Sequence, residues 1–322
     1  MATKRTKPAA EPVAAGKAMN KSKWRLVWND EFDGDSVDTT KWDFDLGNGF
    51  FDYKTHRWIE GWGNEELQYY TKDPDNVSVR DSQLYIRALK EPLHGCGYTS
   101  ARLKTRRRDG TPLFTKRYGR FEIRARVPWG KGLWPALWML PQDDVYGTWA
   151  ASGEIDLMEI VGEKPHEVLG SIHFGATFPK RSLVTHVHRL ANESTVADFH
   201  VYAVEWEPGE IRWSIDGEIW ARQDFWWSCS RKRGGKGVEA ASAADLNPWP
   251  APFDQPFYIL MNVAVGGNFP GVPNAATRFP AELVVDYVRV YDRVGGYGET
   301  TPRGSGRLPY QKKSAEQRVR KP

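Results

Sequence analysis

Three carboxylates lie within the segment ASGEIDLMEIVG (151–162): Glu154, Asp156 and Glu159. Two carboxyl groups held close together can act as a general acid and as a nucleophile or base. Like charges at close range also raise a pKa, so that one carboxyl group stays protonated near neutral pH. The alternative is a solvated acidic strand face, and the three residues alone leave these two interpretations evenly matched.

The spacing of Glu159 conflicts with a regular strand. Side chains alternate between two faces, so Glu154 and Asp156 share one face while Glu159 would point to the other. There it would be buried among apolar residues, which is costly for an unpaired charge. A β-bulge at Leu157-Met158 resets the alternation, and it places all three acids on one face and only apolar residues on the other. The sequence therefore predicts a bulge.

With this bulge, Glu154 and Glu159 are four strand steps apart, roughly 13 Å between Cα atoms at ~3.3 Å per residue. Side chains that lean inward on a curved strand could bring the two carboxyl groups to ~5–6 Å. A separation of about 5–5.5 Å suits a retaining glycosidase and ~6.5–9.5 Å an inverting one. The spacing alone does not choose between these two mechanisms.

The elements that position the acids are strands. Short alternating or apolar runs predict strands at 82–89, 120–127, 211–223, 257–265 and 283–292. In 120–127 the alternation predicts one buried and one solvated face. Asp216-Gly217 predicts a hairpin turn inside 211–223, and the apolar run 257–265 predicts a central strand. Regular strands with Gly and Pro turns indicate an all-β sandwich or jelly roll.

Charge and composition divide the chain into a body and two tails. Residues 1–23 carry a net charge of +5 and residues 293–322 carry +6, so the body, 24–292, carries −7 of the total +4. We expect both tails to be disordered and basic. An acidic body argues against nucleic-acid binding. Within it, 226–256 predicts a long surface loop of the kind that is commonly functional.

The aromatic and cysteine contents bound the class further. The chain has 15 Trp, 13 Tyr and 14 Phe, and surplus Trp supplies flat faces for ligands such as sugars. Cys96 and Cys229 could form one disulfide, which the sequence does not decide. No apolar run is long enough for a transmembrane helix, and no secretory signal is visible at the start.

Around the acids, the sequence resembles glycoside hydrolase family 16, in particular bacterial laminarinases, which are endo-β-1,3-glucanases. The resemblance covers roughly 24–292. It is carried by GEIDLME (153–159), LVWNDEFDG (26–34), GWGNEELQYYT (61–71), YTSARL (98–103), YGRFEIRARVPWGKGLWPALWMLP (118–141), SIHFG (171–175), FHVYAVEW (199–206), MNVAVGGNFPG (261–271) and VDYVRVY (285–291). It implies a β-jelly-roll sandwich of two curved antiparallel sheets with a concave substrate cleft, and a retaining double displacement without a catalytic cofactor.

The resemblance also implies roles for the three acids. Glu154 would be the nucleophile, Asp156 would orient it and tune the titration of the pair, and Glu159 would be the general acid and base. Substrate would be β-glucan, with the enzyme a monomer that is secreted or periplasmic, although no signal peptide is visible. Mixed-linkage β-1,3-1,4-glucan or a galactan remains the alternative substrate. A non-catalytic glucan-binding protein is a further alternative.

Other residues match family positions that contact the sugar or a metal ion. The substrate-binding set is Trp134, Trp138, His173, Asn64, Arg102 and Asn268. The tryptophans would stack on sugar rings, although packing under the sheet is their alternative, and Arg102 could equally be a structural charge partner. Glu31 and Asp286 resemble positions that hold a structural Ca²⁺, which prefers such oxygen ligands; ordinary surface acids are nearly as good an explanation. No Cys/His spacing for zinc is present.

Overall fold

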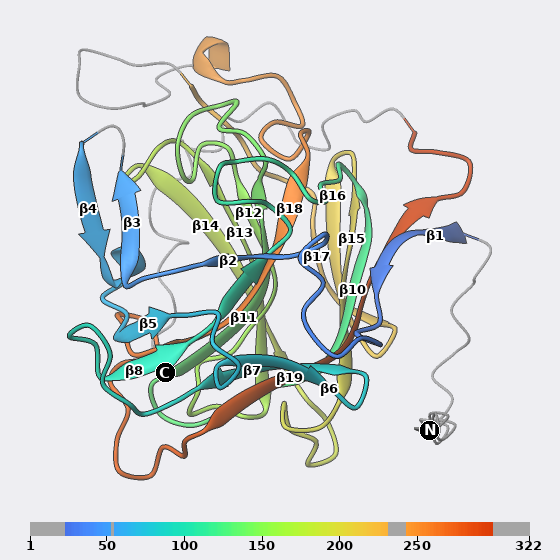
Figure 1. Ribbon diagram of the computed structural model, residues 1–322. Helices are drawn as coiled ribbons and strands as arrows, with labels where there is room; N and C mark the ends of the chain where they lie inside the picture. The colour runs from blue at the N-terminus through green and yellow to red at the C-terminus, as the bar shows by residue number, and fades with distance from the viewer. Residues whose placement is uncertain (1–22, 53–54, 231–242, 299–322) are drawn as a thin grey trace.

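The computed structural model describes residues 23–52, 55–230 and 243–298, most of which form strands or the turns between them (Figure 1). Two large antiparallel sheets lie face to face in a β-sandwich, with the chain crossing repeatedly between them. The predicted all-β jelly-roll architecture is confirmed.

The eight-stranded sheet consists of β1 (Trp24–Asp30), β6 (Val77–Arg80), β7 (Gln83–Ala88), β10 (Gly119–Arg126), β15 (His200–Glu207), β16 (Glu210–Ile215), β17 (Glu218–Gln223) and β19 (Ala281–Arg293). Its order is β17-β16-β15-β10-β19-β7-β6, and β1 pairs with β19. The strands predicted at 82–89, 120–127 and 283–292 are all present here. The predicted hairpin is formed by β16 and β17, and Asp216 and Gly217 both have positive φ, as a type I′ turn requires.

The seven-stranded sheet consists of β2 (Asp43–Asp45), β9 (Arg102–Lys104), β11 (Leu133–Pro141), β12 (Glu154–Glu159), β13 (Glu167–Gly175), β14 (Arg181–Arg189) and β18 (Phe257–Val265). Its order is β14-β13-β12-β11-β18-β9-β2. Every residue of β18 is buried, which confirms the central strand predicted at 257–265. Strand β12, which carries the three acids, lies between β11 and β13 and so has neighbours on both sides.

Small elements complete the fold. They are the antiparallel pair β3 (Gly49–Asp52) and β4 (Arg57–Glu60), the parallel pair β5 (Gln68–Tyr70) and β8 (Tyr98–Ser100), and the 3₁₀ helices η2 (Gly61–Gly63) and η3 (Ala243–Asp245). In Figure 1, β3 and β4 stand on the side of the seven-stranded sheet that faces away from the eight-stranded sheet. In the described part of the chain, no helix has the length and apolar character to cross a membrane.

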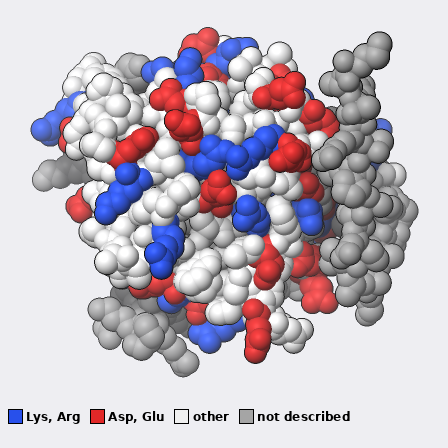
Figure 2. Space-filling view, turned by 60° about the horizontal axis from the view of Figure 1, so that its bottom comes forward, with Lys and Arg blue, Asp and Glu red and all other residues white. Residues whose placement is uncertain are grey.

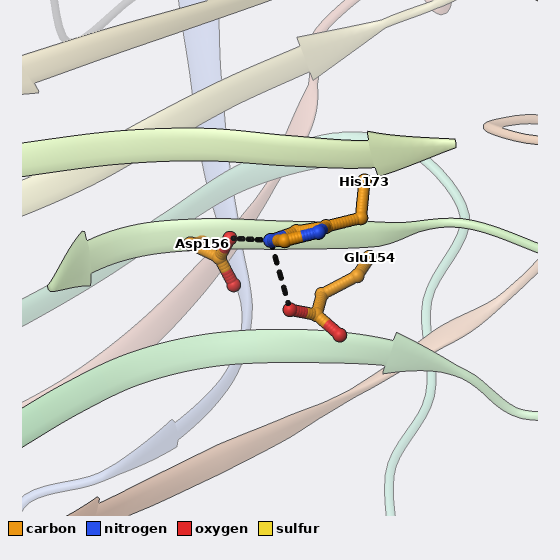
Figure 3. A group of neighbouring side chains, drawn as sticks. All are labelled: Glu154, Asp156 and His173. Carbon is orange, nitrogen blue, oxygen red and sulfur yellow. Dashed lines mark ion pairs between the residues drawn. The ribbon is translucent and has the colours of Figure 1, made fainter. Parts of the chain in front are cut away.

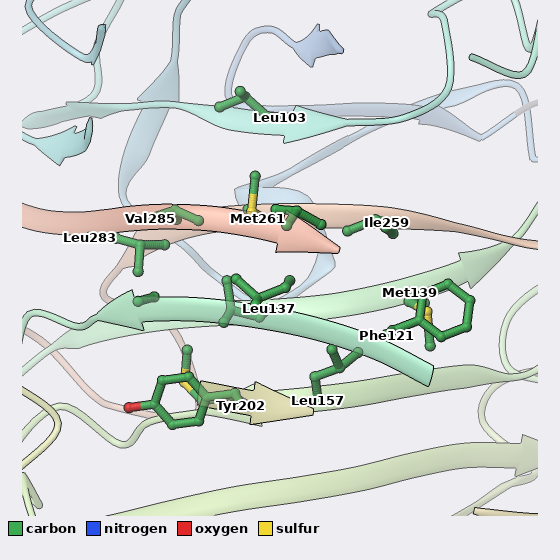
Figure 4. Packing of buried hydrophobic residues seen from close by; sticks show 14 of the residues in the cluster. Leu103, Phe121, Leu137, Met139, Leu157, Tyr202, Ile259, Met261, Leu283 and Val285 are labelled. Carbon is green, nitrogen blue, oxygen red and sulfur yellow. The ribbon is translucent and has the colours of Figure 1, made fainter. Parts of the chain in front are cut away.

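The apolar core lies between the two sheets (Figure 4). Leu137 and Leu157 come from the seven-stranded sheet, and Phe121, Tyr202 and Leu283 come from the eight-stranded sheet. Each large apolar side chain that is fully buried stabilises the fold by ~1.5–3 kcal/mol. Because one face of the seven-stranded sheet supplies this core, its opposite face, here called the open face, is left for polar and aromatic side chains.

The outward face of β10 differs from the prediction. Arg120 and Glu122 belong to the face predicted to be solvated, yet they are only 2% and 5% exposed. Arg120 forms ion pairs with Glu122 at 2.9 Å and with Glu205 at 3.2 Å, and Tyr287 donates a hydrogen bond to Glu122. Long side chains on neighbouring strands cover one another and supply opposite charges, which offsets the loss of hydration. The prediction of a solvated face is therefore wrong for Arg120 and Glu122.

Strand β12 contains the bulge that the spacing predicts. Its register with β11 shifts between Asp156 and Met158, so Leu157 is the extra residue. The side chains of Leu157 and Met158 are both buried in the core. Glu159 consequently returns to the face of Glu154 and Asp156, and the predicted bulge is confirmed.

A tryptophan from the other sheet ties this bulge to the core. The indole Nε1–H of Trp213, on β16, donates to the main-chain oxygen of Asp156 at 2.8 Å. Gly170, on β13, makes room for the ring, because a Cβ at this position would lie 2.5 Å from Trp213. A bulge interrupts the hydrogen-bond ladder of a sheet, and here a side chain bonds the backbone just before the interruption.

The two cysteines do not pair. No disulfide joins Cys96 to Cys229, and Cys229 is fully buried. Figure 2 shows acidic and basic side chains interspersed over one face of the molecule, without a broad area of a single sign.

The boundaries predicted for the tails and the long loop are tested only in part. Residues 1–22 and 299–322 of the predicted tails, and residues 231–242 of the loop 226–256, lie outside the described residues. Past residue 292, the ring of Tyr297 contacts that of Tyr118 at 5.5 Å between centroids. Ordered contacts therefore continue beyond the end predicted for the body.

We predict that Trp213→Phe lowers the free energy of unfolding by about 1–3 kcal/mol, because the buried carbonyl of Asp156 loses its donor. Urea denaturation measures this loss. Trp220→Phe is the matched control, because the indole N–H of Trp220 has no hydrogen-bond partner among the described residues. Equal losses in the two variants would contradict the proposed role of the Trp213 hydrogen bond.

Candidate active site

Glu154, Asp156 and His173 meet on the open face (Figure 3), and Glu159 lies on the same face of β12. His173 is the register partner of Glu154 on β13. Its Nε2 lies 3.4 Å from Glu154 Oε1 and 3.5 Å from Asp156 Oδ2. The side chain of Asp156 is only 2% exposed, whereas those of Glu154 and His173 keep 13% and 14%. A ligand on this face can therefore reach Glu154 and His173, while Asp156 lies beneath them.

Each glutamate receives a hydrogen bond from an indole N–H. Trp149 Nε1–H donates to Glu154 Oε2 at 2.6 Å, and Trp134 Nε1–H donates to Glu159 Oε1 at 3.0 Å. Ser171 Oγ–H adds a longer bond of 3.4 Å to the other oxygen of Glu159. Donors of this kind stabilise the ionised form of a carboxyl group and hold its orientation.

Burial raises the pKa of all three carboxyl groups. The pKa of Glu154 rises to about 8, because loss of hydration and repulsion from Asp156 and Glu159 outweigh the attraction of His173 and the hydrogen bond from Trp149. The pKa of Asp156 rises well above its usual range, because it is buried and lies near Glu159. The acids titrate as one coupled unit, so the cluster retains a proton at neutral pH. It can therefore supply an acid and an anion together.

Trp138 lies on the open face, on the neighbouring strand β11. It is the register partner of Asp156 on β11, and its Nε1–H donates to Asn262 Oδ1 at 2.8 Å. Asn262 in turn donates to the hydroxyl of Tyr70 at 3.1 Å. Trp134 and Trp138 thus share the open face, as their spacing predicts, and their polar edges are fixed by named partners.

Arg102 lies two strands further across the sheet and is not in contact with the acids. Its Nε–H donates to Asp45 Oδ2 at 2.8 Å, and its guanidinium group lies over the ring of Trp62, 3.7 Å from the centroid. The same group is 5.8 Å from the ring centroid of Trp138. Asp45 also pairs with Lys104. Arg102 therefore pairs with Asp45 and packs against the rings of Trp62 and Trp138, here called the aromatic row.

The structure brings Asn64 and Asn268 together at the edge of this row. The main-chain N–H of Asn268 donates to the main-chain oxygen of Asn64 at 2.8 Å. The side chain of Asn64 donates to Glu66 at 3.1 Å, and Gln68 donates to the other oxygen of Glu66 at 2.7 Å. Burial raises the pKa of Glu66. This group is polar, partly exposed and well separated in sequence from the acids.

The predicted calcium ligands are both engaged by arginines. Glu31 accepts two hydrogen bonds of 2.8 Å from Arg289, and Asp286 accepts one of 2.8 Å from Arg124. A calcium ion would have to compete with these guanidinium groups for the same oxygens. The described residues thus fit charge pairing with arginine better than a cation site.

Sequence reasoning missed several residues around the acids. Ser171 lies two positions before His173, so strand parity alone could have found it on the same face. Trp149 precedes Glu154 by five residues but lies in a turn, where no periodicity indicates the direction of a side chain. Tyr70 and Asn262 reach the row by contacts between strands that are distant in sequence.

The family of this chain follows from its similarity to known proteins. The model of Glycosyl hydrolases family 16 matches residues 64–224. The chain is 43% identical over 293 residues to Glucan endo-1,3-beta-glucosidase A1 of Niallia circulans, which covers 87% of this chain and 39% of that protein. The chain belongs to glycosyl hydrolases family 16. It is also 44% identical over 281 residues to the Beta-glucanase of Rhodothermus marinus, which covers 83% of this chain and 85% of that protein.

A solved structure gives the same result for the fold of this glycoside hydrolase. The laminarinase from Rhodothermus marinus superposes with a TM-score of 0.68 at 42% identity, covering 84% of this chain and 98% of that one. The two sheets of this family 16 enzyme thus belong to a shared jelly-roll scaffold.

The raised pKa values predict how stability depends on pH. A carboxyl group whose pKa is higher in the folded state stabilises the fold below its unfolded value of about 4. That contribution is lost as the pH rises through the folded value, which is about 8 for Glu154. We predict that Asp156→Asn raises the Tm by a few degrees at pH 8 and has a smaller effect at pH 4.5.

Thermal unfolding at the two pH values measures this difference. Asp35→Asn, in an exposed loop, is the matched control and should shift the Tm little at either pH. If Asp156→Asn shifts the Tm equally at both pH values, ionisation of the buried acids does not oppose folding.

Proposed function

We propose that the chain is a retaining, endo-acting β-1,3-glucanase that cleaves laminarin-type glucan by double displacement. The observation that carries this proposal is the placement of Glu154 and Glu159 on one face of β12, on either side of the buried Asp156, with a separate indole donor on each glutamate. The similarity to two β-glucanases supports the choice of substrate.

Glu154 is the better candidate for the nucleophile. It has the short hydrogen bond from Trp149 and the nearby imidazole of His173, both of which favour its ionised form. Glu159 has longer bonds from Trp134 and Ser171. The hydrogen-bond donors around the two glutamates therefore favour the anionic role for Glu154 and the acid role for Glu159.

In the first step, the carboxylate of Glu154 attacks the anomeric carbon while Glu159 gives its proton to the departing glycosidic oxygen. In the second step, the ionised Glu159 takes a proton from water, and the water oxygen attacks the same carbon and releases Glu154. Two inversions at one carbon give net retention. Asp156 acts through Glu154, as a positioning residue that shares a proton with it.

The remaining residues are proposed to bind the glucan. They are Trp134, Trp138, His173, Asn64, Arg102 and Asn268. Indole rings can cover the C–H faces of sugars, while the polar group of Asn64 and Asn268 can bond hydroxyls. Arg102 contributes through the ring of Trp62, which it supports from below.

We also propose that the enzyme acts as a monomer outside the cytoplasm, where a polymeric glucan is accessible. Calcium at Glu31 and Asp286 stays a prediction, and the ion would have to displace Arg289 and Arg124 from these carboxylates. Mixed-linkage glucan and galactans remain the alternative substrates, since the loops around the site set this preference.

We predict that the protein releases oligosaccharides from laminarin with retention of anomeric configuration, as measured by mass spectrometry and NMR. Glu154→Gln should lower kcat at least about a thousandfold because the nucleophile is lost, while laminarin still binds. Glu218→Gln, an exposed glutamate on β17, is the control. Preferential cleavage of mixed-linkage glucan, agarose or carrageenan in parallel assays would sink the substrate assignment, and an unimpaired Glu154→Gln would sink the mechanism.

The two indole donors are predicted to act on different limbs of the pH profile. Trp149→Phe removes a donor from ionised Glu154, so the pKa of Glu154 rises and the acid limb of kcat/KM moves up by about one pH unit. Trp134→Phe removes a donor from Glu159, so the alkaline limb moves up instead. Phenylalanine keeps a ring in place for stacking. Activity losses without these separate shifts would mean that the indoles only bind sugar.

A further inference from the structure

The β3–β4 hairpin carries exposed aromatic rings. Phe50, Phe51 and Trp58 are 43%, 40% and 48% exposed. Large aromatic side chains are usually well buried, and a group of exposed ones marks an interaction site. The hairpin precedes residues 64–224, which the family model matches, so it is a feature of this chain outside the matched segment.

The hairpin is held in a defined position. Phe51 and Trp58 are opposite each other in the two strands, and the indole N–H of Trp58 donates to Asn48 Oδ1 at 3.1 Å. The ring of Trp58 also lies against Gly47, where an added Cβ would be 3.7 Å from it. At Gly49 the strands are so close that a Cβ would lie 2.0 Å from the main-chain oxygen of Ile59. A ring fixed in this way can bind a flat surface with little loss of conformational entropy.

Aromatic contacts connect this hairpin to the acids. Phe50 lies 6.3 Å from Trp62 between ring centroids, and Trp62 covers Arg102 at 3.7 Å. Arg102 in turn lies 5.8 Å from the ring of Trp138, whose register partner is Asp156. In Figure 1 the hairpin stands on the same side of the seven-stranded sheet as the open face. Phe50 thus joins the hairpin to the candidate site. Phe51 and Trp58 alternate with Phe50 and lie on the other face of the hairpin, where the ring of Trp58 packs against Gly47, the bridge partner of Tyr70.

We propose that the β3–β4 hairpin is a remote glucan-binding platform that holds sugar units of a long chain beyond the row formed by Trp62 and Trp138. This inference rests on the proposed glucanase function. The occupant is the substrate itself, because the hairpin stands beside the face that carries the acids and because fixed indole and phenyl rings match the C–H faces of glucose units. The platform would favour cleavage of polymers over short oligosaccharides.

The test compares the double variant Phe51→Ala/Trp58→Ala with the wild-type chain on laminarin and on β-1,3-linked gluco-oligosaccharides of increasing length. We expect the ratio of kcat/KM on laminarin to kcat/KM on the trisaccharide to fall about tenfold, mainly through KM. Ile219→Ala is the control, because Ile219 is 53% exposed on β17 of the eight-stranded sheet. Circular dichroism and Tm show whether the double variant remains folded.

Two outcomes overturn the platform. One is an unchanged ratio, which would assign the rings to another partner such as a protein. The other is an equal loss on all lengths, which would indicate a structural effect on the site. Both leave the proposed function standing, because the wild-type chain still cleaves laminarin. If the wild-type chain cleaves no β-1,3-glucan at any length, the proposed function itself fails. A second readout is affinity electrophoresis of Glu154→Gln in laminarin gels, with and without the double substitution; equal retardation would contradict the platform.

Discussion

The hydrogen bond from Trp213 to the main-chain oxygen of Asp156 lies on the strand where two structural requirements meet, those of the core and those of the active site. The core requires apolar side chains from β12, and the open face requires three carboxyl groups from the same strand. A regular strand cannot supply both, because its alternation would bury Glu159. The bulge at Leu157 and Met158 satisfies both demands, and a core tryptophan from the opposite sheet bonds the chain where the bulge begins.

The electrostatics of the site follow from this arrangement. Three acids on one short strand share a small volume, so their charges are coupled and the cluster keeps a proton. Neighbouring side chains on three sides then give each acid a different set of partners. These are Trp149 from the preceding turn, Trp134 from β11, and His173 with Ser171 from β13. The division between anion and acid thus depends on the neighbours of β12 more than on the acids themselves.

Much of the fold and of the candidate site could be predicted from the sequence. Alternation of side chains was enough to predict the strands, the hairpin at Asp216-Gly217 and the bulge, because each follows from local spacing. Alternation failed where contacts with strands distant in sequence determine the burial and the partners of a side chain. Arg120 and Glu122 look solvated by pattern, but partners on β15 and β19 bury them. Trp149 has no periodic signal, and the engagement of Arg102 by Asp45 depends on a register that no local pattern contains.

The bulge also has an evolutionary consequence. Losing either Leu157 or Met158 by a single codon deletion would restore plain alternation to β12. Glu154, Asp156 and Glu159 would still share one face, because the two glutamates would then be four residues apart. The strand would only give the core one apolar side chain fewer. The same three acids can therefore stand on a strand with or without the bulge, and what the extra codon adds is packing in the core.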